Sequence, residues 1–275
     1  MKLWFYVTVF TNVKKEDVVK LEGFVVEEPK TSYEELRLTK KGVALILYTS
    51  GKLLLQGAEK QVEKLSEELE KRGFGKRQKA DHYRKEEGWY IGSDESLKGD
   101  TFGGLVVAAV KADDSLRKKL VELGVADSKK LSDKEIIPLA RNIKKIAPCE
   151  IKSILPDEYN KHQGSITEML NTFHQEVAGY LLPGIHVVDK YPGCNVGTIR
   201  EEKAEDKYVE VAAASILARA AALEQLDFLS MEAGFPLPKG STHVAAALQE
   251  LRERGLEFSQ FVKLHFSNVK EFLKG

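Results

Sequence analysis

Two adjacent carboxylates, Asp94 and Glu95, follow an apolar run that ends at Ile91. A second apolar run begins at Gly103, so the acids lie near a turn between two predicted strands. Because consecutive side chains of a strand point to opposite faces, both carboxylates can reach one cation only where the strand ends. Acidic pairs are common in a chain with 31% charged residues. The pair therefore indicates a cation site only together with further acids.

Further acids occur in two comparable settings. Asp189 ends the apolar stretch 185–188, and α/β folds place their sites at the carboxyl ends of such strands. A turn or a helix cap explains Asp189 equally well. Glu205 and Asp206 come shortly before a long alanine-rich segment, where the helix dipole alone favours acids. From the residues alone, a helix start is the better explanation of this second group.

Composition limits the class of protein. A chain of 275 residues can form one large domain, or a small domain and a medium one. Its 43% hydrophobic and 31% charged content are typical of a soluble protein. Cys149 and Cys194 lack a metal-ligand spacing, which favours free thiols in the cytoplasm. The sequence shows neither a cleavable leader nor a membrane-spanning run, so we expect no membrane association.

The composition changes between residues 71 and 85. Asp81 is the only acid there, Phe74 and Tyr83 are interleaved, and the cations are Lys71, Arg72, Lys76, Arg77, Lys79, Arg84 and Lys85. A solvated linker and a segment that follows a phosphate backbone both fit this pattern. We predict a small domain over residues 1–75, a basic linker over 76–88 and a large domain over 89–275.

The small domain is predicted to be an α+β unit. Residues 3–10 form an apolar strand, and the runs 43–48 and 53–57 around a glycine turn predict a hairpin. Residues 58–72 have the apolar spacing of a helix. The polar stretch 31–37 predicts a helix or a loop.

The large domain alternates strands and helices, as α/β proteins do. The strands are expected at 89–94, 103–111, 149–155 and 185–189. The helices are expected at 113–123, 133–146, 166–182, 207–232 and 242–254. The alanines within 212–218 favour a closely packed helix face over a binding surface.

Taken in order, these motifs resemble the type 2 ribonucleases H, and the segments 124–131 and 203–219 are similar to further signatures of that family. Ser93, Asp100, Phe102 and the segments 237–240 and 263–268 resemble ribonuclease HIII in particular. The hairpin 47–57 is similar to the N-terminal domain of that family, which is related in fold to the TATA-box-binding protein. The resemblance implies an α/β fold: a ribonuclease H-like mixed sheet flanked by helices, behind a small N-terminal α+β domain that binds substrate.

This resemblance implies an endoribonuclease that hydrolyses the RNA strand of RNA/DNA hybrids by a two-metal-ion mechanism, leaving 5′-phosphate and 3′-hydroxyl ends. Mg²⁺ or Mn²⁺ would be the cofactor, because these hard cations prefer oxygen ligands. The chain would act as a monomer without an obligatory protein partner. The implied ligands are Asp94, Glu95, Asp189 and Glu205, with Asp206 as a rival for the fourth position. The alternatives are ribonuclease HII-like cleavage at single embedded ribonucleotides and a non-catalytic hybrid-binding protein.

The resemblance also implies substrate contacts around a turn that would meet the ribose 2′-hydroxyl, the group that distinguishes RNA from DNA. Leu97 stands where the family usually has glycine, so we predict a preference for runs of ribonucleotides. His265 could assist product release, but packing is the better explanation. The expected substrate contacts are Ser93, Ser96, Leu97, Lys98, Gly99 and Lys129, together with Tyr48 and Lys52 on the small domain.

Overall fold

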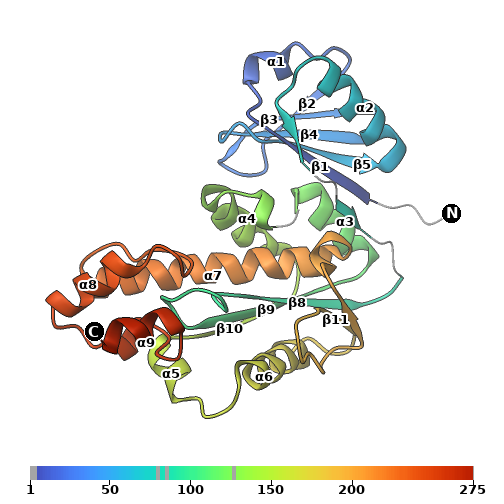
Figure 1. The fold of residues 1–275 in the computed structure, drawn as a ribbon. Helices are drawn as coiled ribbons and strands as arrows, with labels where there is room; N and C mark the ends of the chain where they lie inside the picture. The colour runs from blue at the N-terminus through green and yellow to red at the C-terminus, as the bar shows by residue number, and fades with distance from the viewer. Residues whose placement is uncertain (1–4, 79–80, 84–86, 126–127, 275) are drawn as a thin grey trace.

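The structure is a computed structural model that describes residues 5–78, 81–83, 87–125 and 128–274. Figure 1 shows a small α/β domain above a larger one, with helices on both faces of the larger sheet. Within the described residues, no helix combines the length and apolar character needed to cross a membrane.

The small domain is built on a seven-stranded antiparallel sheet with the strand order β2-β3-β4-β5-β1-β6, in which β7 also pairs with β1. The predicted hairpin and the helix that follows it are confirmed. The elements are β1 (Phe5–Thr11), α1 (Lys15–Val19), β2 (Val25–Glu27), β3 (Glu34–Lys40), β4 (Val43–Tyr48), β5 (Leu53–Ala58), α2 (Glu59–Lys71), β6 (Lys76–Arg77) and β7 (Asp81–Tyr83).

Two stretches of the small domain differ from expectation. Residues 31–37 were expected to be helical or irregular, yet most of them belong to β3. The sequence pattern is misleading because Glu34 and Arg37 are buried as a pair, where apolar residues would normally mark a strand. Part of the expected linker 76–88 forms β6 and β7 at the edge of the sheet, while its residues 79–80 and 84–86 lie outside the described residues.

The large domain contains the expected mixed sheet flanked by helices. Its order is β10-β9-β8-β11-β12; β8, β9 and β10 are antiparallel, and β11 is parallel to both β8 and β12. The strands are β8 (Tyr90–Ser96), β9 (Leu105–Ala112), β10 (Cys149–Ile154), β11 (Ile185–Asp189) and β12 (Ile199–Glu201). The helices are α3 (Asp114–Leu123), α4 (Asp133–Ile146), α5 (Pro156–Lys161), α6 (Ile166–Gly179), α7 (Val209–Ala233), α8 (Ala245–Glu253) and α9 (Ser267–Lys274), with 3₁₀ turns at η1 (Ser128–Lys130), η2 (Ala204–Asp206) and η3 (Phe258–Gln260).

The helix α7 lies directly on β8 and β9, with α3 and α4 behind it, while α6 covers the opposite face (Figure 1). Gly92 allows this close approach, because a Cβ atom there would lie 2.3 Å from the backbone nitrogen of Val211. The predicted small-residue packing face is confirmed, since Ala212, Ala213 and Ala214 are fully buried. The approach of α7 brings η2, which immediately precedes it, to the end of β11.

The two domains share a core. Val7, Val9 and Ile46, on the face of the small sheet away from α2, belong to the same buried cluster as Val121 and Leu139 of the large domain. Polar contacts surround this apolar interface. Nη1 of Arg37 donates to the carbonyl oxygen of Glu122 at 3.0 Å, and Oγ of Ser50 donates to the carboxylate of Glu135 at 2.8 Å.

Candidate active site

The parallel pairing of β8 and β11 brings two of the predicted acids together. Val188 pairs with Ser93, so Asp189 and Asp94 are the next residues on neighbouring strands. Oδ1 of Asp189 accepts a hydrogen bond from the backbone N–H of Ala204 at 3.0 Å. This bond holds η2, and with it Glu205, against the same edge of the sheet.

The carboxylates at this edge repel one another. Burial raises the pKa of Asp94 well above its usual range, and the charges of Glu95, Asp189 and Glu205 raise it further. Burial also raises the pKa of Asp189 to about 6, with contributions from Glu205 and Glu95. The four predicted acids from three separate segments therefore act on one another as a single cluster.

Glu95 differs from the other acids of the cluster because two side chains, Lys98 and His174, contact its carboxylate. Burial acts to raise its pKa, but the hydrogen bond from His174 and the ammonium of Lys98 outweigh this effect, and the pKa is lowered. Lys98 Nζ lies 2.5 Å from Oε1, and His174 Nε2 lies 3.3 Å from Oε2. These two partners therefore favour the ionised form of Glu95.

Glu205, and not Asp206, faces the other acids. Its carboxyl is 5% exposed, and its charge raises the pKa of both Asp94 and Asp189. Oε1 of Glu205 accepts from Lys129 Nζ at 2.9 Å, whereas its buried Oε2 has no hydrogen-bond partner among the described residues. Asp206 is partly exposed.

The cluster has the chemistry of a site for hard cations. It consists of carboxylates without a thiolate, which is the donor set that Mg²⁺ and Mn²⁺ prefer. The mutual repulsion and the unpartnered Oε2 of Glu205 would both be relieved by a divalent cation. In the part of the chain that the structure describes, no three His, Cys, Asp or Glu side chains already form a metal-coordinating group. Lys98, Lys129 and backbone N–H groups instead bind several of the carboxylate oxygens.

The turn after the acids has an unusual backbone. Leu97 has a φ of 66°, a conformation that costs a residue with a Cβ atom about 1–2 kcal/mol. Its side chain is 4% exposed and packs in the main core, which offsets that cost. This conformation explains physically why a glycine would be usual here. Ser96 and Lys98 are partly buried beside it, and Gly99 is exposed.

Two of the expected substrate contacts lie inside the protein, and a third is half-buried between the domains. The side chain of Ser93 is fully buried, so it cannot touch a nucleic acid in this conformation. Tyr48 is 3% exposed in the interface between the domains, where burial raises its pKa. Lys52 Nζ lies 3.5 Å from the carboxylate of Glu135 in the same interface. The positions of Ser93 and Tyr48 therefore do not fit a substrate contact, whereas the role of the partly exposed Lys52 stays a prediction.

Two histidines, His174 and His186, lie next to the acids. His174 and His186 both contact Ser93, and His174 also contacts Glu95. A local sequence signal for this grouping does not exist, because α6, β8 and β11 meet only in the folded chain. His265, in contrast, stacks on Tyr159 with ring centroids 5.6 Å apart, which agrees with the expected packing role.

The C-terminal segment 263–268 holds the turn that follows the acids. Lys263 is fully buried and donates from Nζ to the carbonyl oxygens of Asp100 at 2.6 Å and Gly103 at 2.9 Å. Asn268 donates to Oγ1 of Thr101 at 2.8 Å. The segment 237–240 adds a bond from the N–H of Gly240 to Oδ1 of Asp100 at 2.6 Å. The two segments that resemble ribonuclease HIII in particular, 237–240 and 263–268, therefore both hold the turn that follows the acids.

Replacing Lys263 by methionine should destabilise the protein increasingly as the pH rises. Burial lowers the pKa of Lys263 from 10.5 to about 7, so between these values the unfolded chain binds a proton that the folded chain does not. As the pH rises between these values, the unfolding free energy of the unaltered protein gains about 1.4 kcal/mol per pH unit from this group. The variant lacks the group and does not gain this stability. We expect the loss in unfolding free energy to grow by about 2 kcal/mol from pH 7 to pH 9, as measured by urea unfolding.

The control for this experiment is Lys270→Met, on the same C-terminal segment. Lys270 is exposed on α9, so its substitution should change the unfolding free energy equally at both pH values. A loss for Lys263→Met that does not depend on pH would show that the ammonium stays charged in the folded protein.

The fold and the acidic cluster define a known class of nuclease. The family model of ribonuclease HII matches residues 91–192 and 188–269. The chain is 36% identical to ribonuclease HIII of Geobacillus kaustophilus, over 84% of this chain and 85% of that protein. It is also 36% identical to ribonuclease HIII of Protochlamydia amoebophila, over 92% of this chain and 90% of that protein.

Solved structures agree with these relatives. The structure of Bst-RNase HIII in complex with Mn²⁺ is similar over 98% of each chain, with 27% identity and a TM-score of 0.63. The structure of Aquifex aeolicus RNase H3 covers 94% of this chain and all of that one, with 29% identity and a TM-score of 0.58. The chain belongs to the ribonuclease HIII family, and it is a ribonuclease H endonuclease.

Proposed function

We propose that this chain cuts the RNA strand of RNA/DNA hybrids, leaving 5′-phosphate and 3′-hydroxyl ends, with Mg²⁺ or Mn²⁺ held by Asp94, Glu95, Asp189 and Glu205. The convergence of these four acids, and the pKa elevation it causes at Asp94 and Asp189, carries the proposal. Such repulsion is costly unless cations neutralise it. The Mn²⁺ in the structure of Bst-RNase HIII, a related protein, supports the same cofactor class.

Bound divalent cations would supply a nucleophilic water and stabilise the charge that develops on the leaving oxygen. The residues of the chain position the substrate around them. The turn of residues 96–99 lies beside Glu95 and can present backbone groups to a ribose 2′-hydroxyl. Lys129, whose side chain is 76% exposed beside Glu205, can turn its ammonium to a phosphate of the cut strand.

We further propose that the small domain contributes phosphate contacts to the hybrid. The face of its sheet that carries Tyr48 packs against the large domain, so these contacts must use other parts of its surface. Arg77 pairs with Glu63 and Glu70, whereas Lys76 at the sheet edge is exposed. Contacts to phosphates carry little sequence information, which suits an enzyme that cuts hybrids of any sequence.

The test is cleavage of three substrates in Mg²⁺ and in Mn²⁺: a continuous hybrid, a DNA duplex with one embedded ribonucleotide, and a DNA duplex. Because the strained Leu97 backbone occupies the ribose-reading turn, we expect the continuous hybrid to be cut fastest. Equal rates on the single ribonucleotide would favour ribonuclease HII-like behaviour. Binding without cleavage would favour a non-catalytic hybrid-binding protein, and end-labelling of the products would identify the ends.

Binding of Mn²⁺ should weaken as the pH falls below about 6. Burial raises the pKa of Asp189 to about 6, and a protonated carboxyl must lose its proton before it can bind a cation. We expect the affinity, titrated without substrate, to fall by up to about tenfold per pH unit below pH 6. Asp157→Asn, on α5, is the control and should leave the profile unchanged. An affinity that stays constant from pH 7 to pH 5 would contradict this expectation.

A further inference from the structure

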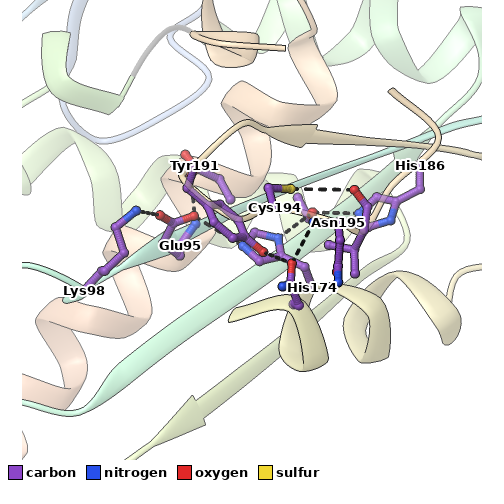
Figure 2. A network of polar contacts seen from close by, with 11 residues as sticks. Glu95, Lys98, His174, His186, Tyr191, Cys194 and Asn195 are labelled. Carbon is purple, nitrogen blue, oxygen red and sulfur yellow. Dashed lines mark hydrogen bonds and ion pairs between the residues drawn. The ribbon is translucent and has the colours of Figure 1, made fainter. Parts of the chain in front are cut away.

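A continuous chain of buried polar contacts reaches Glu95 from the α6 face of the sheet (Figure 2). His186 Nε2 lies 2.8 Å from Ser93 Oγ, and Ser93 Oγ lies 2.8 Å from His174 Nδ1. His174 Nε2 then lies 3.3 Å from Oε2 of Glu95. Ser93 and His174 are fully buried, and His186 is 9% exposed. Polar groups so far from water must satisfy one another.

The direction of these hydrogen bonds follows from the chemistry of the groups. An ionised carboxylate can only accept, so His174 Nε2 donates to Glu95. In neutral His174, Nδ1 then accepts from the hydroxyl of Ser93, whose oxygen accepts from His186 Nε2–H. In protonated His174 the bonds beyond Nδ1 reverse, but Nε2 still donates to Glu95. The contact with Glu95 therefore has the same direction in both cases.

The two oxygens of Glu95 are held in different ways. Oε2 contacts His174, whose ring packs against Tyr191 with centroids 5.4 Å apart and has no exposed surface. Oε1 contacts Lys98, whose long side chain is 40% exposed at the surface. The ammonium can move into solvent without disturbing the core, whereas the imidazole cannot. A cation entering the cluster would therefore displace Lys98 and leave His174 in place.

We propose that His174, oriented by Ser93, is a positioning residue that fixes Oε2 of Glu95 and leaves Oε1 as the oxygen that binds a divalent cation. The proposal rests on the proposed function, in which Glu95 is a metal ligand. His186 lies on β11 three residues before Asp189, so the same contacts also tie together the strands that carry Asp94 and Asp189. Outer hydrogen bonds of this kind commonly change metal affinity by about 10- to 100-fold.

Two substitutions of His174 distinguish a role in positioning Glu95 from a role in packing alone. In His174→Gln, the side-chain amide can still donate to Glu95 from the position of Nε2. In His174→Asn, the shorter amide can still bond to Ser93 from the position of Nδ1, but it cannot reach Glu95. We expect Mn²⁺ affinity, measured without substrate from the electron paramagnetic resonance of free Mn²⁺, to be about 10- to 100-fold weaker in His174→Asn than in His174→Gln. Equal affinities in the two variants would overturn the proposal.

Glu95→Gln distinguishes this proposal from the proposed function. If Glu95→Gln retains full Mn²⁺ affinity and cleavage, Glu95 is not a ligand and the proposed site fails. If Glu95→Gln loses affinity while His174→Asn keeps it, only the positioning role fails. Long-range ¹H–¹⁵N spectra of the unaltered, metal-free protein give a test that needs no variant to fold. We expect a proton on Nε2 of His174, and an unprotonated Nε2 would overturn the proposal.

Discussion

Asp94→Asn is expected to reduce the rate of hybrid cleavage by about a thousandfold or more, while making the metal-free protein more stable at pH 8. Asparagine keeps the shape of the side chain but removes a negative ligand charge from the centre of the cluster. Stabilisation of a reacting phosphate by bound cations is worth several kcal/mol, and each tenfold in rate corresponds to about 1.4 kcal/mol. Single-turnover cleavage of a continuous hybrid measures the first effect.

The gain in stability follows from the raised pKa of Asp94. Burial and the charges of Glu95, Asp189 and Glu205 make the ionised form unfavourable in the folded chain. The stability that this carboxyl contributes is therefore fully present below its ordinary pKa of 3.8 and is lost as the pH rises through its raised pKa in the folded chain. Asparagine does not ionise, so the unfolding free energy of the variant, measured in a chelator at pH 8, should exceed that of the unaltered protein.

Glu205→Gln and Asp206→Asn are the matched controls. The charge of Glu205 raises the pKa of both Asp94 and Asp189, so Glu205→Gln should lose cleavage to a similar extent, whereas Asp206→Asn should retain most of it. The reverse order would identify Asp206 as the fourth ligand. Full activity in Asp94→Asn would contradict the proposed site as a whole.

Arg37→Ala is expected to cost about 3–5 kcal/mol of unfolding free energy, the range measured when one partner of a buried ion pair is removed. Arg37 is 1% exposed and binds Glu34 through Nε and Nη2, both at 2.9 Å. Its Nη1 also donates to the carbonyl of Glu122 at the end of α3. The substitution removes the cationic partner of the buried Glu34 carboxylate, which keeps only a weaker bond from the backbone N–H of Lys30. It also opens a cavity at the contact between the domains.

Two comparisons make this experiment specific. Lys118→Ala removes an exposed ion pair with Glu122 on the same helix and should cost less than about 0.5 kcal/mol. A double variant with leucine at both Arg37 and Glu34 should recover much of the loss, because a buried pair can often be replaced by apolar residues. Urea unfolding measures all three variants. A loss for Arg37→Ala as small as that for Lys118→Ala would mean that this pair does not stabilise the contact between the domains.

The regular elements were predictable where the apolar spacing was simple. The hairpin of β4 and β5, the strands β8 and β11, and the helices α2, α4 and α7 all lie within two residues of their expected bounds. The sequence pattern did not predict the strand β3, because the buried residues Glu34 and Arg37 are charged and their types are typical of an exposed segment. Alternation of polar and apolar residues identifies a strand only when its buried side is apolar.

The candidate site was predictable in its residues but only partly in its arrangement. The sequence was enough to predict acids at the strand ends and to find the resemblance to ribonuclease HIII. The sequence could not predict the burial of Ser93, because its partners His174 and His186 come from the distant elements α6 and β11. The burial of Tyr48 was missed for the same reason, since the surface that covers it belongs to another domain.

Local residue types and spacing therefore sufficed to predict the family, the longer regular elements and the acids available for chemistry. The packing of strands and helices alone brings Glu205 toward Asp94 and places His174 against one oxygen of Glu95. The same packing lets Lys263 hold the turn after the acids. These contacts join segments 79 to 163 residues apart, and such contacts are set by how strands pair and helices pack.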